Sequence, residues 1–122
     1  MFIAAIISTL IWGAIIAIGG YFIIKFTLDW IMNKIDEYFF NKEVDSAVVS
    51  DIDSMMDKCT NRKSYDLLKK TRAKGYTHVM AKTDANGQII GKVDLVKDTN
   101  STLDPEVAEL LGDEKMVVIE RN

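Results

Sequence analysis

The stretch FIAAIISTLIWGAIIAIGGYFII, from Phe2 to Ile24, contains no charged residue and is followed by Lys25. As a helix rising 1.5 Å per residue it would be about 34 Å long, which matches the ~30 Å hydrocarbon core of a bilayer. A cleaved signal peptide is disfavoured, because its apolar stretch is only about 7–15 residues long and follows a basic start. The stretch therefore predicts a single transmembrane helix that anchors the chain in a lipid bilayer.

Basic residues lie on only one side of this predicted span. Lys25, Lys34 and Lys42 follow it and nothing basic precedes it, and an excess of Lys and Arg marks the cytoplasmic side of a membrane segment. We therefore expect a single-pass protein of the inner (plasma) membrane, with its N-terminus outside and its C-terminal domain in the cytoplasm. The single cysteine, Cys59, fits a reducing compartment because a lone thiol cannot form an intrachain disulfide.

Small residues recur at every fourth position of the predicted span, at Ala5, Thr9, Gly13 and Ala17. On a helix this spacing makes a shallow ridge that lets two backbones approach closely in lipid. The ridge predicts a transmembrane packing surface and a homo-oligomer. Because no ionisable residue lies within the span, any transport would have to come from assembly of several helices.

The helical spacing of apolar residues continues past Lys25, at Leu28, Ile31, Met32, Ile35, Tyr38 and Phe39. It predicts one continuous helix of about 60 Å from Phe2 to Lys42. The polar positions carry acids as well as lysines, so packing against another copy or against the following domain is favoured over the membrane interface. The chain then divides into a transmembrane and juxtamembrane helix, residues 1–42, and a cytoplasmic α+β domain, residues 43–122.

Two helices are predicted at the start of that domain, over about residues 44–60 and 62–74. The second would be capped by Asn61 or Ser64 and would end at Gly75. The alternative is that the two run on as one helix.

Strand signals follow. Two runs of period two, residues 77–83 and 88–97, flank Asn86-Gly87 and predict an antiparallel hairpin. Asp104-Pro105 predicts the start of a short helix that Gly112 ends, and residues 115–121 predict a third strand, apolar on both faces. The predicted fold class is thus a membrane-anchored α+β protein.

Charge is segregated along the chain, although the totals of 15 basic and 18 acidic residues look balanced. Residues 43–57 are acidic without a basic residue, and the next segment is strongly basic. An anion-binding hypothesis places a nucleotide, an oligonucleotide or a phosphorylated partner on that segment, at Arg62, Lys63, Tyr65, Lys69, Lys70, Arg72 and Lys74. The alternatives are a solvated face paired with the acidic runs, and a surface for anionic lipid.

Catalytic motifs are not found. His78 is the only histidine and no orienting carboxylate or nucleophile can be assigned to it. Cys59 lies on an apolar helical face, and the sequence contains neither a phosphate loop nor a dinucleotide fingerprint. We therefore expect no enzyme activity, no metal and no cofactor.

By its layout the chain resembles small single-span membrane effectors in which a cytoplasmic sensor controls a membrane bundle, such as the cyclic-nucleotide-responsive effectors of bacterial antiphage defence. This resemblance concerns the layout and includes no matched motif. The first functional hypothesis is an oligomeric membrane protein whose cytoplasmic domain binds a ligand, such as an anionic nucleotide, or a partner, and regulates the membrane helices. The second is a non-catalytic accessory or scaffold subunit of a larger membrane complex.

Overall fold

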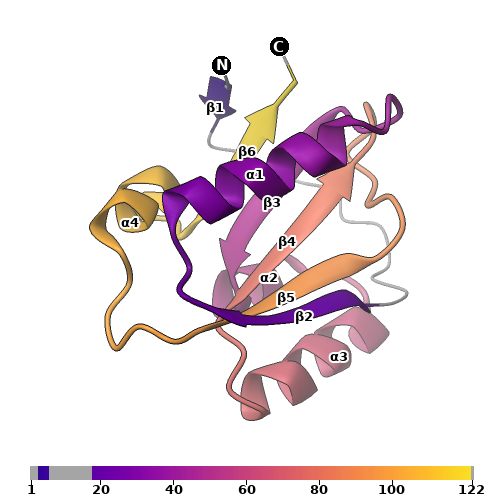
Figure 1. The fold of residues 1–122 in the computed structure, drawn as a ribbon. Coiled ribbons are helices and arrows are strands. Elements are labelled where there is room, and N and C mark those ends of the chain that lie inside the picture. Colours follow the sequence, from indigo (N-terminus) through magenta and orange to yellow (C-terminus); the bar gives the residue numbers. More distant parts are fainter. Residues whose placement is uncertain (1–2, 6–17, 122) are drawn as a thin grey trace.

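The computed structural model describes residues 3–5 and 18–121, which form one mixed sheet with helices on both faces (Figure 1). The elements, in chain order, are β1 (Ile3–Ala5), β2 (Ile18–Ile24), α1 (Leu28–Phe39), β3 (Ser46–Asp51), α2 (Ile52–Lys58), α3 (Arg62–Ala73), β4 (His78–Thr83), β5 (Val93–Asp98), α4 (Pro105–Leu111) and β6 (Met116–Glu120).

The sheet has six strands in the order β1-β6-β3-β4-β5-β2. All neighbouring strands are antiparallel except β2, which runs parallel to β5. The strands β3, β4, β5 and β6 in the middle of the sheet are buried along most of their length. Burial on both faces is expected where helices cover both sides of a sheet.

Successive residues of these strands point into two separate cores, because side chains alternate across a sheet. Val48 faces α2 and α3, where it packs with Met55 and Leu68. Its neighbour Val49 faces α1 and α4, in the core that contains Ile31. Segments before and after residue 42 therefore share the same sheet and the same cores.

The predicted transmembrane helix is wrong. Ile3–Ala5 and Ile18–Ile24 are strands at opposite edges of the sheet, and no helix in the described part of the chain is long and apolar enough to cross a membrane. Exposure alternates along β2 and leaves Tyr21 and Ile23 54% and 60% exposed. The length of the uncharged run met the criterion for a membrane-spanning helix. The Gly19-Gly20 pair and the aromatic and β-branched residues after it, however, are typical of an edge strand.

The predicted placement in the inner membrane, with the N-terminus outside and a cytoplasmic domain, is corrected by the same finding. Of the four predicted membrane packing residues, Ala5 lies in β1, while Thr9, Gly13 and Ala17 fall outside the described residues. With Ala5 in a strand, the four positions do not form one helical ridge, and self-association of the chain stays a prediction.

The continuous helix to Lys42 is also wrong, since α1 begins only at Leu28. The hydroxyl of Thr27 caps it by accepting the backbone N–H of Trp30 at 3.2 Å. Its apolar stripe, with Ile31, Ile35 and Tyr38, is buried against the sheet. Packing against the following domain was one of the two predicted uses of this stripe.

The predicted helix over 44–60 is correct only in its second half. Ser46–Asp51 forms β3, between β4 and β6, and the helix starts after Asp51, whose carboxylate accepts the N–H of Ser54 at 2.7 Å. The spacing of Val44, Val48 and Ile52 suits a helix. Residues 46–50, however, are all buried, so this segment is a strand with packing partners on both faces of the sheet.

The remaining elements are confirmed with shifts of their ends, the largest at β5, which begins at Val93 and not at residue 88 as predicted. Asn61 caps α3, the antiparallel pair of β4 and β5 follows, and Asp104 caps α4 with Pro105 in the first turn. Gly75, Gly87 and Gly112 have positive φ, as their predicted positions require. The third predicted strand is β6, which is buried on both faces.

The alternation along β2 predicts that neighbouring substitutions differ in effect. Ile23→Thr should change the free energy of unfolding by less than about 0.5 kcal/mol, because Ile23 is 60% exposed. Phe22→Thr should cost about 1–2 kcal/mol, because the Phe22 ring packs on Trp30 with centroids 5.3 Å apart. Denaturant melts of both variants measure these changes in the free energy of unfolding. Equal losses of stability in the two variants would contradict the assignment of Ile18–Ile24 as a strand.

Candidate functional site

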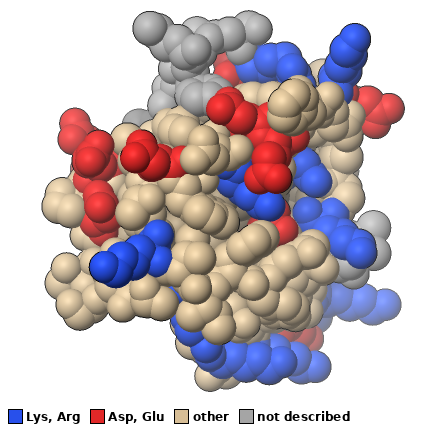
Figure 2. Space-filling model, viewed as in Figure 1, with Lys and Arg blue, Asp and Glu red and all other residues tan. Residues whose placement is uncertain are grey.

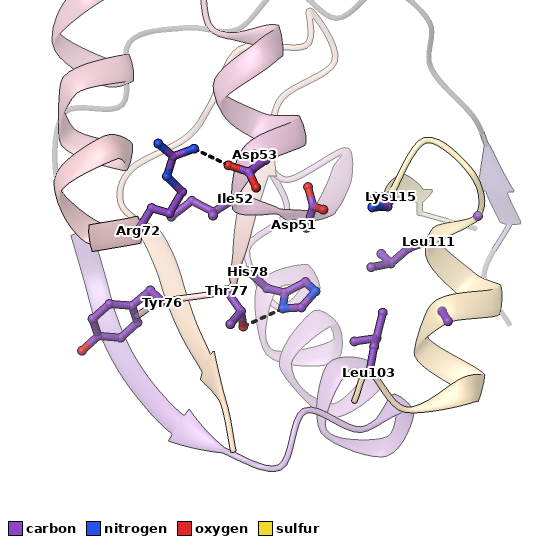
Figure 3. A pocket seen from close by; sticks show the side chains of 12 residues that line it. Asp51, Ile52, Asp53, Arg72, Tyr76, Thr77, His78, Leu103, Leu111 and Lys115 are labelled. Carbon is purple, nitrogen blue, oxygen red and sulfur yellow. Dashed lines mark hydrogen bonds and ion pairs between the residues drawn. The ribbon is translucent and has the colours of Figure 1, made fainter. Parts of the chain in front are cut away.

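A hollow of about 440 Å³ lies at the end of the sheet where β3 ends and β4 begins; it is called the His78 hollow below (Figure 3). Its walls come from the end of β3, the start of α2, the end of α3, the start of β4, and α4 with the loops on either side of it. The lining residues are Asp51, Ile52, Asp53, Arg72, Tyr76, Thr77, His78, Leu103, Ala108, Leu111, Gly112 and Lys115.

His78 is the first residue of β4 and pairs with Asp51 in the register of β3. The side chain is only 6% exposed. One face of the imidazole is covered by the Phe26 ring, with centroids 4.6 Å apart and planes inclined by 33°. The ring reaches into the space between Asp51, Lys115 and Leu103 (Figure 3).

The hydrogen bonds of Thr77 guide the assignment of the tautomer of this imidazole. The Thr77 hydroxyl donates its one proton to the Val96 carbonyl at 3.2 Å and accepts the backbone N–H of Asp98 at 3.2 Å. With its proton on the Val96 carbonyl, the hydroxyl accepts from Nδ1 of His78 at 2.8 Å, and we assign the imidazole proton to Nδ1; donation of the hydroxyl to Nδ1 instead would place that proton on Nε2. The other nitrogen, Nε2, then has a bare lone pair, and within the described residues it has no hydrogen-bond partner.

Burial lowers the pKa of His78 from its ordinary value of 6.5, while the carboxylates of Asp51 and Asp98 oppose this shift. Desolvation disfavours the charged imidazolium. At neutral pH the hollow therefore contains a neutral imidazole that accepts a hydrogen bond through Nε2.

Lys115 lines the hollow next to Asp51, in the turn between α4 and β6 (Figure 3). It has φ of 57°, a value that non-glycine residues adopt uncommonly. Its N–H donates to the Gly112 carbonyl at 3.1 Å, and its carbonyl accepts the Asp51 N–H at 2.9 Å. These bonds on both sides hold the strained backbone conformation, and such strain is often associated with functional sites.

Arg72 reaches the rim of the hollow from the end of α3. Its Nη1 donates to Oδ1 of Asp53 at 2.6 Å, which raises the pKa of the guanidinium. Both side chains are exposed to solvent, so this ion pair orients Arg72 more than it stabilises the fold. This ion pair is one contact of the kind predicted between the basic helix and the acidic residues 43–57.

The predicted anion-binding residues do not meet at one point. Helical spacing places Arg62, Lys69 and Arg72 on one flank of α3, and Lys63, Lys70 and Lys74 on the other. Figure 2 shows basic side chains along the edge formed by α3, away from the acidic side chains over α4. Tyr65 is 38% exposed, and of all seven residues only Arg72 lines the His78 hollow.

A second hollow, of about 380 Å³, lies beside α1 near the start of β5. Its floor is a buried pair in which the Tyr38 hydroxyl donates to Oδ2 of Asp94. Burial, followed by the charge of Asp94, raises the pKa of Tyr38. The ammonium groups of Lys34 and Lys82 lie 5.9 and 5.1 Å from the centre of the Tyr38 ring, within the range of cation–π contacts.

Other chemistry has little geometric support in the part of the chain that the structure describes. No three His, Cys, Asp or Glu side chains there converge to hold a metal ion. Cys59 is half-buried beside the α2–α3 core, and burial raises the pKa of its thiol. It is therefore a weak nucleophile at neutral pH.

Sequence reasoning missed the His78 hollow. His78 was expected to be structural, and Asp51 and Lys115 were not connected with it. Asp51 meets His78 only through the pairing of β3 with β4, and β3 was predicted as helix. The only available signal was the isolated histidine at the start of a strand.

Comparison of the chain with protein-family models, with curated protein sequences and with solved structures gives no match. The site must therefore be interpreted from its own geometry.

The buried neutral His78 predicts a specific pH dependence of stability. Its pKa is lower in the folded chain than in the unfolded chain. As the pH falls below about 6.5, the unfolded chain binds a proton that the folded chain does not, so the free energy of unfolding decreases. Denaturant melts from about pH 7.5 to about pH 5 should show a steeper loss in the wild type than in His78→Gln. Parallel curves of stability against pH for the two proteins would contradict a buried, neutral His78, because the carboxylates contribute equally to both proteins.

Proposed function

We propose that this chain is a non-catalytic ligand-binding domain that holds a small amphipathic molecule in the His78 hollow. One observation carries the proposal: a buried imidazole, with Nδ1 in contact with the Thr77 hydroxyl, lines a hollow with apolar walls and a charged rim. The volume of about 440 Å³ lies within the usual range for small-molecule sites, and a few polar groups on an apolar surface are typical of them.

Binding is favoured over catalysis because the hydroxyl nearest His78 is not activated. In the assigned tautomer the Thr77 hydroxyl donates to the Val96 carbonyl and not to the imidazole. A nucleophile would need the opposite arrangement, with the base accepting that proton.

The test blocks the hollow from its exposed side. Ala108 is an exposed residue of α4 that lines the hollow, whereas its neighbour Glu109 is exposed and does not line it. We expect full-length wild type and Glu109→Trp to be stabilised in thermal melts by members of a panel of small aromatic and aliphatic carboxylates, phosphates and amines. Ala108→Trp should lose this stabilisation. Equal stabilisation of both variants, or none by any compound in the wild type, would overturn the proposal.

A second candidate is docking of an anionic partner along α3, in an accessory or scaffold role. The exposed side chains of Lys63, Lys69, Lys70 and Lys74 favour it, since none of them forms an ion pair with another described residue. Such binding should weaken steeply with salt, unlike binding in the hollow. Titration with a polyanion such as heparin at two salt concentrations distinguishes the two candidates.

A further inference from the structure

The inner end of the His78 hollow accepts hydrogen bonds. In the tautomer assigned above, Nε2 of the neutral His78 has a lone pair and no proton, and the neighbouring Asp51, whose Oδ1 already accepts the Ser54 N–H, adds a negative charge. His78 is 6% exposed, so water has little access to it. A ligand that placed an acceptor here would leave Nε2 of His78 unpaired, at a cost that a donor avoids.

The rim of the hollow has the opposite character. Lys115 is exposed and forms no ion pair within the described residues. Arg72 uses Nη1 for Asp53, and its other guanidinium donors are not used by that bond. Two cations at an opening favour a carboxylate or phosphate group.

Between these two ends the walls are apolar, formed by Ile52, Leu103 and Leu111. Ile52 and Leu111 are almost fully buried and each is 3% exposed. They belong to different cores and to elements on opposite faces of the sheet. This wall therefore suits a compact apolar body rather than a sugar or a chain of hydroxyls.

We infer that the ligand of the His78 hollow is a small molecule with an apolar body, an N–H or O–H donor that binds Nε2 of His78, and a carboxylate or phosphate that binds Lys115. The inference rests on the proposed function and specifies its ligand class. A hydroxyaryl carboxylate has all three features.

Protonation of His78 distinguishes this arrangement from simple attraction of an anion. The charged groups facing the ring are Asp51 from β3, Asp98 from β5, and Lys115, with the Arg72–Asp53 pair at the rim. The imidazolium has two N–H donors and no acceptor, so the ligand's donor would lose its partner. Binding should therefore weaken as the pH falls, whereas binding of an anion by charge alone should strengthen.

The experiment is calorimetric titration of the full-length protein with three matched probes. These are 4-hydroxyphenylacetate, 4-methylphenylacetate, which lacks the donor, and 4-hydroxyphenylacetamide, which lacks the charge. We expect the first to bind, the second about tenfold more weakly, and the third about fivefold more weakly. Binding of the first should weaken between about pH 7.5 and about pH 5.5.

Protein variants test the Lys115 contact separately. Lys115→Gln should weaken 4-hydroxyphenylacetate about fivefold and leave the amide unchanged, because only the acid uses that charge. Lys58→Gln is the matched control, since Lys58 does not line this hollow.

The outcomes separate the ligand class from the proposed function. Equal binding of the methyl probe, or stronger binding at low pH, would overturn the donor assignment while a ligand still occupies the hollow. Binding of none of the three probes would overturn the ligand class. Whether the hollow binds ligands at all is decided by Ala108→Trp.

Discussion

Phe26→Ala is expected to lower the free energy of unfolding by about 3–5 kcal/mol, the range for truncating a buried phenylalanine. Phe26 is fully buried between β2 and α1, and its ring contacts both Trp30 and His78. Its backbone N–H donates to Oδ1 of Asp98 at 3.2 Å, which fixes the chain just before α1.

The same substitution should change the site. Removing the ring uncovers one face of His78, so water can solvate the imidazolium and the pKa of His78 should rise towards 6.5. Chemical denaturation and an NMR titration of the histidine measure the two effects. Phe40→Ala is the control, because Phe40 is 85% exposed. If Phe26→Ala resembled this control in both measurements, α1 would not pack as described.

Tyr38→Phe is expected to cost about 3 kcal/mol although it removes a single oxygen atom. The Tyr38 hydroxyl donates to the carboxylate of Asp94, and the two residues are 6% and 7% exposed. Without the hydroxyl, a buried carboxylate loses its donor, and an unpaired buried charge is costly. Denaturant melts provide the measurement.

A double-mutant cycle distinguishes this cost from lost packing. In Tyr38→Phe/Asp94→Leu both polar partners are replaced, so the double variant should be more stable than Tyr38→Phe alone. Purely additive losses would show that the two side chains are not coupled.

Local signals predicted the second half of the chain well. Asn61 and Gly75 delimit α3, Asn86-Gly87 marks the turn between β4 and β5, and Asp104-Pro105 begins α4. Each depends on the backbone chemistry of a few neighbouring residues, which the sequence displays directly. The four apolar residues 116–119 indicated a strand buried on both faces, and β6 is such a strand.

The first half depends on partners that are distant in the chain. Ile18–Ile24 is a strand because β5 is its parallel neighbour, with Tyr21 opposite Leu95. Parallel pairing requires a long connection, so no local signal identifies it. Ser46–Asp51 likewise needs β4 and β6 on its two sides. An apolar run without these partners satisfies a helix or membrane criterion equally well.

The candidate site shows the same dependence. The basic character of α3 was visible in the sequence, but only Arg72 of that set reaches the His78 hollow. Asp51 and His78 meet through strand register, and Lys115 joins them through a turn at positive φ. The tautomer assigned to His78 further depends on the Thr77 hydroxyl and its hydrogen bonds to β5.

The central claim is that His78 presents an unprotonated Nε2 to the hollow. Long-range ¹⁵N–¹H correlation NMR of the full-length protein tests it directly, since the chain contains one histidine. At pH 7 we predict a protonated Nδ1 and a pyridine-type Nε2, and the Nε2 signal should move when 4-hydroxyphenylacetate binds. A proton on Nε2, or an imidazolium at this pH, would contradict the account.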